Sequence, residues 1–243
     1  MFGVQGRTVA AVTLRATMGR KRALLFALPP LVLLLVTIAL KLGHAERAAW
    51  PAEIVGVFGF TVVMPLTALI IGTSVLGAEI DDGSVVHLLA TPVPRWVVIG
   101  SKYTVATGLT MLFAAVPELL AGLIATGGAT KLAIGLFAGA LAGSLMYNAV
   151  FVMLSAVTSR AIAVGLGYVL VWEALLGNLV AGARLLSVGQ YSLGVADSIA
   201  HDPALNAQIG LPTAVVMGAI VTVAALVIAA GRLASFSLKG DAT

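Results

Sequence analysis

Two glutamates, Glu118 and Glu173, each stand in the middle of a long apolar stretch of the sequence. A carboxylate at the depth of a membrane core costs at least about 2.5 kcal/mol unless it is protonated or paired, so each should face protein or water. Two alternatives stay open for both: each lines a substrate path or relays protons, or each is structural. In the structural case a protonated Glu118 donates to the Phe113 carbonyl that Pro117 leaves free. Asn178, just after Glu173, is a candidate to line the same central cavity or a dimer seam.

No other cluster of residues has the spacing of a catalytic or metal site. The histidines His44, His87 and His201 are scattered, and the absence of cysteine excludes zinc-thiolate and iron–sulfur sites. Asp197 and Asp202 fall close to His201 at a spacing that could contact a cation, and we interpret this group instead as a solvated turn. We therefore expect no catalytic residue, no metal and no cofactor bound by this chain itself.

A nucleotide-binding loop of the form Gly-x4-Gly-Lys-Ser/Thr is also absent from the sequence. Residues 186–190 read Leu-Ser-Val-Gly-Gln, one mismatch from the Leu-Ser-Gly-Gly-Gln signature of ABC ATPases. Without a phosphate loop to accompany it, we interpret this short match as chance. Any ATPase that works with the chain must be a separate protein.

The composition places these residues in a membrane. Of 243 residues, 60% are hydrophobic and 10% are charged, and the mean hydropathy is +1.09. A soluble fold of this size cannot hide so much apolar surface, which excludes a soluble enzyme, a disordered chain and a nucleic-acid module. The net charge of +4 is spread along the chain and forms no basic patch for nucleic acid. We expect an integral membrane protein with a single transmembrane domain over residues 1–243.

Six apolar stretches are long enough, at about 20 residues each, to cross a bilayer as helices. They are residues 23–40, 54–77, 97–125, 132–157, 161–183 and 211–233. With six spans both termini share a side, and that side carries Arg7, Arg15, Arg20, Lys21, Arg22, Arg95, Lys102, Arg160, Arg232 and Lys239. The other side carries only Lys41, Arg47, Lys131 and Arg184. Because basic residues favour the cytoplasmic side, we predict a multi-pass protein of the inner (plasma) membrane with both termini cytoplasmic.

Three segments outside these spans are long enough to have roles of their own. Residues 5–22 place Arg7 and Arg15 on one side of a helix, which predicts an amphipathic helix on the inner leaflet. Residues 184–210 form a long outer segment before the last span. Residues 79–96 connect the second and third spans on the inner side, and N-cap residues followed by Thr-Pro predict a short helix there.

Prolines and glycines are expected to shape the spans. Pro65 and Pro117 each free a carbonyl one turn back and bend the helix that contains it. Gly135, Gly139 and Gly143 recur at four-residue spacing, which places them on one face and lets another helix approach closely. We expect that face to pack within the chain, and a dimer interface is the alternative.

The inner segment carries an ordered motif. It reads Glu79, three residues, Gly83-Ser84, Leu88-Leu89, Thr91-Pro92 and Arg95, followed by Gly100 and Lys102. This order resembles the first cytoplasmic loop of the ABC-2 type transporter permeases, which typically reads Glu, three residues, Gly-Thr or Gly-Ser, Leu-Leu, Thr-Pro and Arg. Serine in place of threonine and an additional proline are departures that leave the assignment of the loop intact.

The resemblance implies a fold, a site and partners. The fold is an all-α membrane domain with six transmembrane helices, an N-terminal surface helix, a coupling helix between spans 2 and 3, and an outer segment that often partly re-enters the membrane and caps the substrate path. In that family the inner loop docks on a separate ATP-binding subunit. The residues to which the resemblance gives this coupling role are Glu79, Asp82, Gly83, Ser84, Leu88, Leu89, Thr91, Pro92 and Arg95. Two permease chains, expected here to be identical, and two ATPase chains form the exporter, with ATP and Mg on the ATPase.

We therefore expect the permease subunit of an ATP-driven exporter, a chain that catalyses no reaction itself. The alternative is a self-contained, proton-coupled carrier that uses Glu118 and Glu173 as relay groups. A co-purifying ATPase distinguishes the exporter, and loss of activity without a proton gradient distinguishes the carrier. The sequence does not name the cargo.

Overall fold

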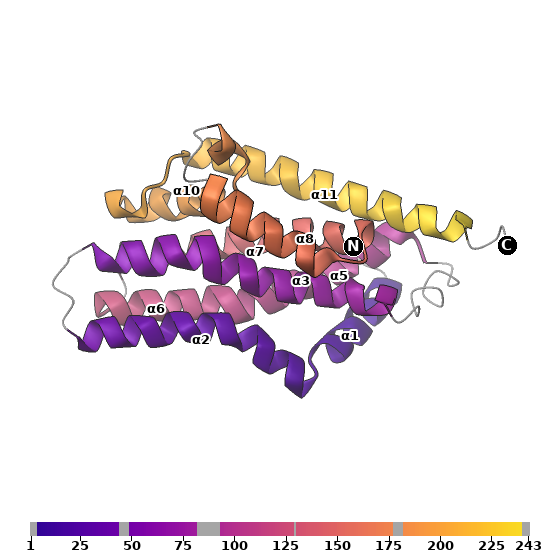
Figure 1. Cartoon of the computed structure of the whole chain (residues 1–243), viewed down its shortest axis with the longest axis horizontal. Helices are drawn as coiled ribbons and strands as arrows, with labels where there is room; N and C mark the ends of the chain where they lie inside the picture. Colours follow the sequence, from indigo (N-terminus) through magenta and orange to yellow (C-terminus); the bar gives the residue numbers. More distant parts are fainter. Residues whose placement is uncertain (1–3, 44–48, 82–92, 129, 177–181, 240–243) are drawn as a thin grey trace.

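Figure 1 shows a computed structural model of the chain, which describes residues 4–43, 49–81, 93–128, 130–176 and 182–239. Every regular element within these ranges is helical. The α-helices are α1 (Val4–Thr17), α2 (Arg20–Leu42), α3 (Met64–Asp81), α5 (Arg95–Thr110), α6 (Val116–Thr126), α7 (Lys131–Val157), α8 (Ala161–Gly167), α10 (Val188–Ala200) and α11 (Leu211–Lys239). The π-helical segments are η1 (Pro51–Val63), η2 (Met111–Ala115) and η3 (Tyr168–Leu176), and the 3-10 turns are η4 (Ala183–Leu186) and η5 (Pro203–Leu205).

Five helical runs among the described residues are long and apolar enough to cross a membrane, which confirms an all-helical, multi-pass membrane protein. They are Arg22–Leu42, Pro51–Gly77, Arg95–Thr126, Lys131–Val157 and Leu211–Leu233. The predicted span 161–183 corresponds to a shorter apolar helix, Ala161–Glu173. The described helix there ends at Leu176, so the count of six spans stays a prediction.

The long helices lie side by side along the long axis of the molecule (Figure 1). α10 and the start of α11 lie at one end, which we call the cap end. α1 and the last residues of α11 lie at the opposite end, which we call the basal end. The N-terminal and C-terminal helices of the chain therefore share an end of the bundle.

Widened helical turns precede the two prolines that the sequence singled out. In η1 the Met64 N–H donates to the Gly59 carbonyl, five residues back, and η2 ends in the same pattern. Pro65 and Pro117 follow directly, and neither has an N–H for a regular helical bond. A π-helical turn moves the bonding register by one residue, which accommodates the proline without ending the helix.

The glycine face of α7 is covered by α10. A methyl group at Gly135 would lie 2.5 Å from the Ala196 carbonyl oxygen, and one at Gly139 would lie 2.6 Å from the Ser192 carbonyl oxygen. At Gly143 a methyl group would meet the Ser192 hydroxyl at 2.5 Å. Because glycine has no Cβ, the two backbones approach each other closely. This face therefore packs within the chain, against the segment that the sequence pattern presents as an outer connection.

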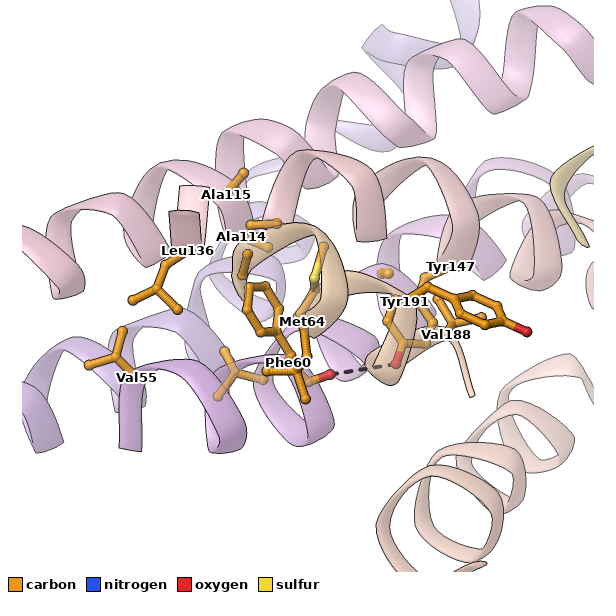
Figure 2. Packing of buried hydrophobic residues seen from close by; sticks show 14 of the residues in the cluster. Val55, Phe60, Met64, Ala114, Ala115, Leu136, Tyr147, Val188 and Tyr191 are labelled. Carbon is orange, nitrogen blue, oxygen red and sulfur yellow. Dashed lines mark hydrogen bonds between the residues drawn. The ribbon is translucent and has the colours of Figure 1, made fainter. Parts of the chain in front are cut away.

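Two clusters of buried apolar side chains hold the bundle together. The larger one draws on η1, η2, α7 and α10, and Figure 2 shows its part around Phe60 and Met64. The Tyr147 hydroxyl donates to the Phe60 carbonyl at 3.5 Å within it. The second cluster joins α3, α5 and α11 around Ile71 and Val98. The described outer segment is thus part of the core rather than a loop outside it.

Candidate functional site

A buried carboxylate joins η3 to the start of α10. Glu173 is 2% exposed, and its two oxygens accept four hydrogen bonds. Oε1 accepts from the Tyr168 hydroxyl at 2.8 Å and from the Val188 N–H at 2.9 Å. Oε2 accepts from the Ser187 hydroxyl at 2.5 Å and from the Gly189 N–H at 3.3 Å. We call these five residues the Glu173 clasp.

The start of α10 is built to receive a carboxylate. The first N–H groups of a helix have no partner within it and carry the positive end of its dipole. Ser187 is the N-cap, and its Oγ accepts from the Gln190 N–H at 3.1 Å while its hydroxyl hydrogen points to Glu173. The amides of Val188 and Gly189, which follow the N-cap, donate to Glu173. The helix terminus and the carboxylate therefore satisfy each other in the interior of the bundle.

Further hydrogen bonds fix the chain between η3 and α10. The Trp172 indole N–H donates to the Leu186 carbonyl at 3.3 Å. The Tyr191 hydroxyl donates to the Leu185 carbonyl. Both contacts hold the η4 turn against the helices on either side of it, so the clasp is supported by its surroundings.

Glu118, in the first turn of α6, is equally buried and differently surrounded. It is 2% exposed, and its Oε1 has no hydrogen-bond partner among the described residues. The carboxylate lies against Gly59 of η1, where a methyl group would stand 2.8 Å from Oε2 and closer still to Oε1. The structural alternative is a hydrogen bond from a protonated Glu118 to the Phe113 carbonyl, and Oε1 does not make it in the described part of the chain. The side chain is directed at the neighbouring helix instead.

One carboxylate lies against η1 directly, and the other is linked to it through Gly189 of α10. Glu118 lies against Gly59 on one side. On the other side a methyl group at Gly189 would stand 3.1 Å from Glu173 Oε2 and 3.5 Å from the Phe60 carbonyl oxygen. A shift of η1 would therefore change the surroundings of both carboxylates.

The two helices on either side of the inner segment, residues 79–96, meet at the basal end. Glu79 lies in the last turn of α3, and Arg95 is the first residue of α5. Lys102 of α5 is fully buried, and its Nζ donates to the Val75 carbonyl of α3 at 2.7 Å. This hydrogen bond ties together the two helices on either side of residues 82–92. The residues of interest that lie outside the described part of the chain are Asp82, Gly83, Ser84, Leu88, Leu89, Thr91, Pro92 and Asn178.

The acidic residues near His201 belong to a turn. Asp197 Oδ1 accepts from the Asp202 N–H at 3.1 Å, and Asp202 Oδ1 accepts from the Ala204 N–H at 3.0 Å. His201 ends α10 with a φ of 52°. Among the residues that the structure describes, no three His, Cys, Asp or Glu side chains are grouped to hold a metal ion.

Comparison with known proteins points to one family. A family model described as ABC-2 family transporter protein matches residues 20–171, more than half of the chain. The match begins with α2, includes residues 79–96 and ends within η3. No curated protein matches the chain.

Proposed function

The chain belongs to the ABC-2 family of transporters, and we propose that it is the membrane permease subunit of an ATP-driven exporter. The family match over residues 20–171 carries this proposal, because permeases of this family generally work with an ABC ATPase subunit and have no ATPase site of their own. ATP and Mg would bind to the partner. The motif in residues 79–102 supports the same conclusion.

The proposed assembly has two copies of this chain and two ATPase subunits, with the basal end in the cytoplasm. The basal end carries α1, the start of α5 and the C-terminal part of α11, which include many of the basic residues of the chain. Single cysteines test the orientation cleanly, because the chain has none of its own. An impermeant maleimide added to intact cells should label Asp202→Cys and not Arg160→Cys. The reverse pattern would refute a cytoplasmic basal end.

The proposed coupling route enters through residues 79–96 and continues into α3 and α5. These helices end and begin at the segment, and the hydrogen bond from Lys102 to the Val75 carbonyl links them, so the proposal is that they move as a pair. Tilting the pair displaces η1, since η1 and α3 form one continuous span. η1 in turn lies against Glu118 at Gly59, and its Phe60 carbonyl faces Gly189, which donates to Glu173. The motion of an ATPase can thus reach the cap end through contacts within one helix.

The Glu173 clasp is proposed to hold the cap end closed. Opening a path there requires α10 to separate from η3, and this separation breaks hydrogen bonds to the carboxylate. The clasp opposes opening until the movement of η1 strains it. Glu118, whose Oε1 has no hydrogen-bond partner in the described ranges, is the proposed polar group of the substrate path, and Asn178 is a further candidate for it.

The experiment that tests the function is purification of the tagged full chain from its native membranes in a mild detergent, with identification of every co-purifying protein. We expect a stoichiometric soluble subunit with a phosphate-binding loop. Deletion of residues 85–90 should abolish the association, because it removes the proposed coupling helix. Arg184→Gln, a charge change at the cap end, is the matched control and should retain the subunit.

A chain that purifies alone, even after chemical cross-linking, would contradict the exporter. That result would favour the self-contained carrier, whose activity should then follow the proton gradient. Retention of the ATPase by the deletion variant would preserve the exporter and move the coupling site away from residues 79–96. The two failures are therefore distinguishable.

A further inference from the structure

The exposed face of α1 combines two arginines with apolar side chains. Arg7 and Arg15 flank a shallow hollow of about 490 Å³ on this helix. Eight residues separate them, which corresponds to about 12 Å along a helix. The residues that line the hollow are Arg7, Thr8, Ala11, Val12 and Arg15. α1 contains no acidic residue, so the helix offers positive charge without internal neutralisation.

The opposite face of α1 is fixed to the protein. Gly6, Thr13 and Thr17 are buried, and they lie about half a helical turn away from the arginine face. The Ser101 hydroxyl of α5 donates to the Gly6 carbonyl at 3.1 Å. α1 therefore cannot roll to bury its arginines, and the basic face is held outward at the basal end.

Exposed apolar side chains on α1 and directly after its end distinguish a lipid ligand from a soluble anion. Val12 is 61% exposed and Met18 is 44% exposed, close in sequence to the two arginines. A guanidinium donates a planar pair of hydrogen bonds that matches a phosphate oxygen pair. A soluble anion would use the arginines and leave the apolar side chains in water. An anionic phospholipid uses both, because its phosphate meets the arginines and its chains cover the apolar residues.

We propose that Arg7 and Arg15 form a binding site for the headgroup of an anionic phospholipid of the leaflet at the basal end. The site lies outside the transport path and needs no ATPase, so it goes beyond the proposed function. Its consequence does reach that function, because α1 is fastened to α5, which begins directly after the proposed coupling segment. A bound headgroup fixes α1 and thereby α5, which makes coupling dependent on the lipid composition.

Native mass spectrometry of the detergent-solubilised full chain tests the site. The probes are palmitoyl-oleoyl phosphatidylglycerol and the phosphatidylcholine with the same acyl chains, titrated separately. The wild-type chain should bind phosphatidylglycerol more tightly. Each arginine near a charged surface contributes about a fivefold factor in affinity, so Arg7→Gln with Arg15→Gln should weaken phosphatidylglycerol binding about 30-fold. Phosphatidylcholine binding should not change.

Arg160→Gln is the matched control, because Arg160 is exposed and directly precedes α8 rather than belonging to α1. It should bind phosphatidylglycerol like the wild type. If the double variant does not fold, Arg15→Gln alone should give about a fivefold loss. Equal losses in the α1 variants and in Arg160→Gln, or equal binding of the two lipids by the wild type, would overturn the proposal. Displacement of phosphatidylglycerol by millimolar inorganic phosphate would overturn it too, because it would identify a free-phosphate site.

Discussion

Glu173 and Glu118 are two carboxylates buried to the same extent in one bundle, and their surroundings are opposite. Glu173 accepts four hydrogen bonds, two of them from the amides at the start of α10. Glu118 has an oxygen without any partner among the described residues. The two side chains are therefore equally buried, but only Glu173 has hydrogen-bond donors for both of its carboxylate oxygens. A buried polar group that lacks partners is costly, so this oxygen of Glu118 does not contribute to stability by hydrogen bonding with the described residues.

This contrast indicates different roles for the two glutamates, which the sequence alone does not distinguish. The free energy that burial of Glu173 costs is offset by the helix terminus that it caps, so this residue is part of the structure of the cap. Glu118 keeps one acceptor without a partner from the part of the chain that the structure describes, which is the arrangement that the proposed substrate path uses. η1 lies against Glu118 directly and against Gly189 of the Glu173 clasp, so a movement of η1 reaches both carboxylates by different contacts.

Removal of each carboxylate should give the largest difference. Glu173→Ala leaves two buried amides and two hydroxyls without their acceptor, at about 1–3 kcal/mol for each orphaned group, so we expect about 4 kcal/mol against docking of α10. Glu118→Ala breaks no described hydrogen bond, and its packing loss is partly offset by removal of an unsatisfied buried oxygen, so the net cost should stay below about 1 kcal/mol. Maleimide labelling of Ser192→Cys, at a fully buried position of α10, reports cap opening. The labelling rate should rise at least about 100-fold in the Glu173 variant.

In the Glu118 variant the same cysteine should stay protected, with a rate within about tenfold of the wild type. Similar rates in the two variants would mean that the clasp does not hold the cap. Labelling of Gly182→Cys, on the exposed turn before η4, controls for the reactivity of the reagent and should be equal in all chains.

The next comparison is between two glycines that differ in what a methyl group would contact. Gly139→Ala forces a methyl group to within 2.6 Å of the Ser192 carbonyl oxygen, which is backbone and cannot turn away. We expect a loss of about 2 kcal/mol, measured as the free energy of unfolding in detergent micelles. Gly59→Ala instead presses on the end of the Glu118 side chain, which has rotamers available. Its cost should be smaller.

Shortening Glu118 provides the control for that prediction. Glu118→Ala should remove most of the cost of Gly59→Ala in the double variant, since it removes the atoms in the way. The same substitution should leave the cost of Gly139→Ala unchanged. Additive effects of Gly59→Ala and Glu118→Ala would contradict the contact between these two residues.

The sequence predicts the helices well because hydropathy and length describe each apolar stretch by itself. The sequence also identifies Glu118 and Glu173 as residues whose burial in a membrane costs free energy. It does not distinguish them, because three of the four partners of Glu173 arrive only when the chain turns back and starts α10, fourteen to sixteen residues later. One local signal is present: Ser187, followed three residues later by Gln190, is a pattern that starts helices. Residues 186–190 also resemble the ABC ATPase signature, and that resemblance draws attention away from their helix-starting pattern.

Burial at the basal end escapes sequence analysis for a similar reason. Lys102 reads as a charge that marks the cytoplasmic side, and a long lysine near a helix end usually extends toward the headgroups. The structure buries it against the Val75 carbonyl instead. The position of α3 beside α5 decides this, and no pattern within α5 indicates it. The close fit of α7 and α10 is the opposite case, because three glycines at four-residue spacing predict a close partner without naming it.

Conversion of each carboxylate to an amide sharpens the comparison without changing shape. The amide of the Glu173→Gln variant keeps one acceptor and turns the other into a donor that faces donors, so this change should cost about 1.5 kcal/mol of unfolding free energy. Glu118→Gln breaks no described hydrogen bond and should change it by less than about 0.5 kcal/mol. Heat denaturation of both purified variants measures the difference.

Transport separates the two amide variants further. We expect Glu173→Gln to be inserted and expressed but to transport with altered coupling to ATP hydrolysis, because its cap opens more easily. Glu118→Gln should bind the ATPase normally. If Glu118→Gln loses transport only when a proton gradient is the energy source, the self-contained carrier gains support over the exporter.

The smallest expected effect concerns a single hydroxyl of the clasp. Tyr168→Phe removes one hydrogen bond to Glu173 Oε1 and leaves the Val188 amide on the same oxygen, so the loss should be about 1 kcal/mol of unfolding free energy. Combined with Glu118→Gln, the change should be additive, since the two residues share no partner. Combined with Glu173→Gln, it should be smaller than when made alone, because an amide oxygen is a weaker acceptor than a carboxylate. Equal costs in both backgrounds would show that Tyr168 stabilises η3 by packing rather than through the carboxylate.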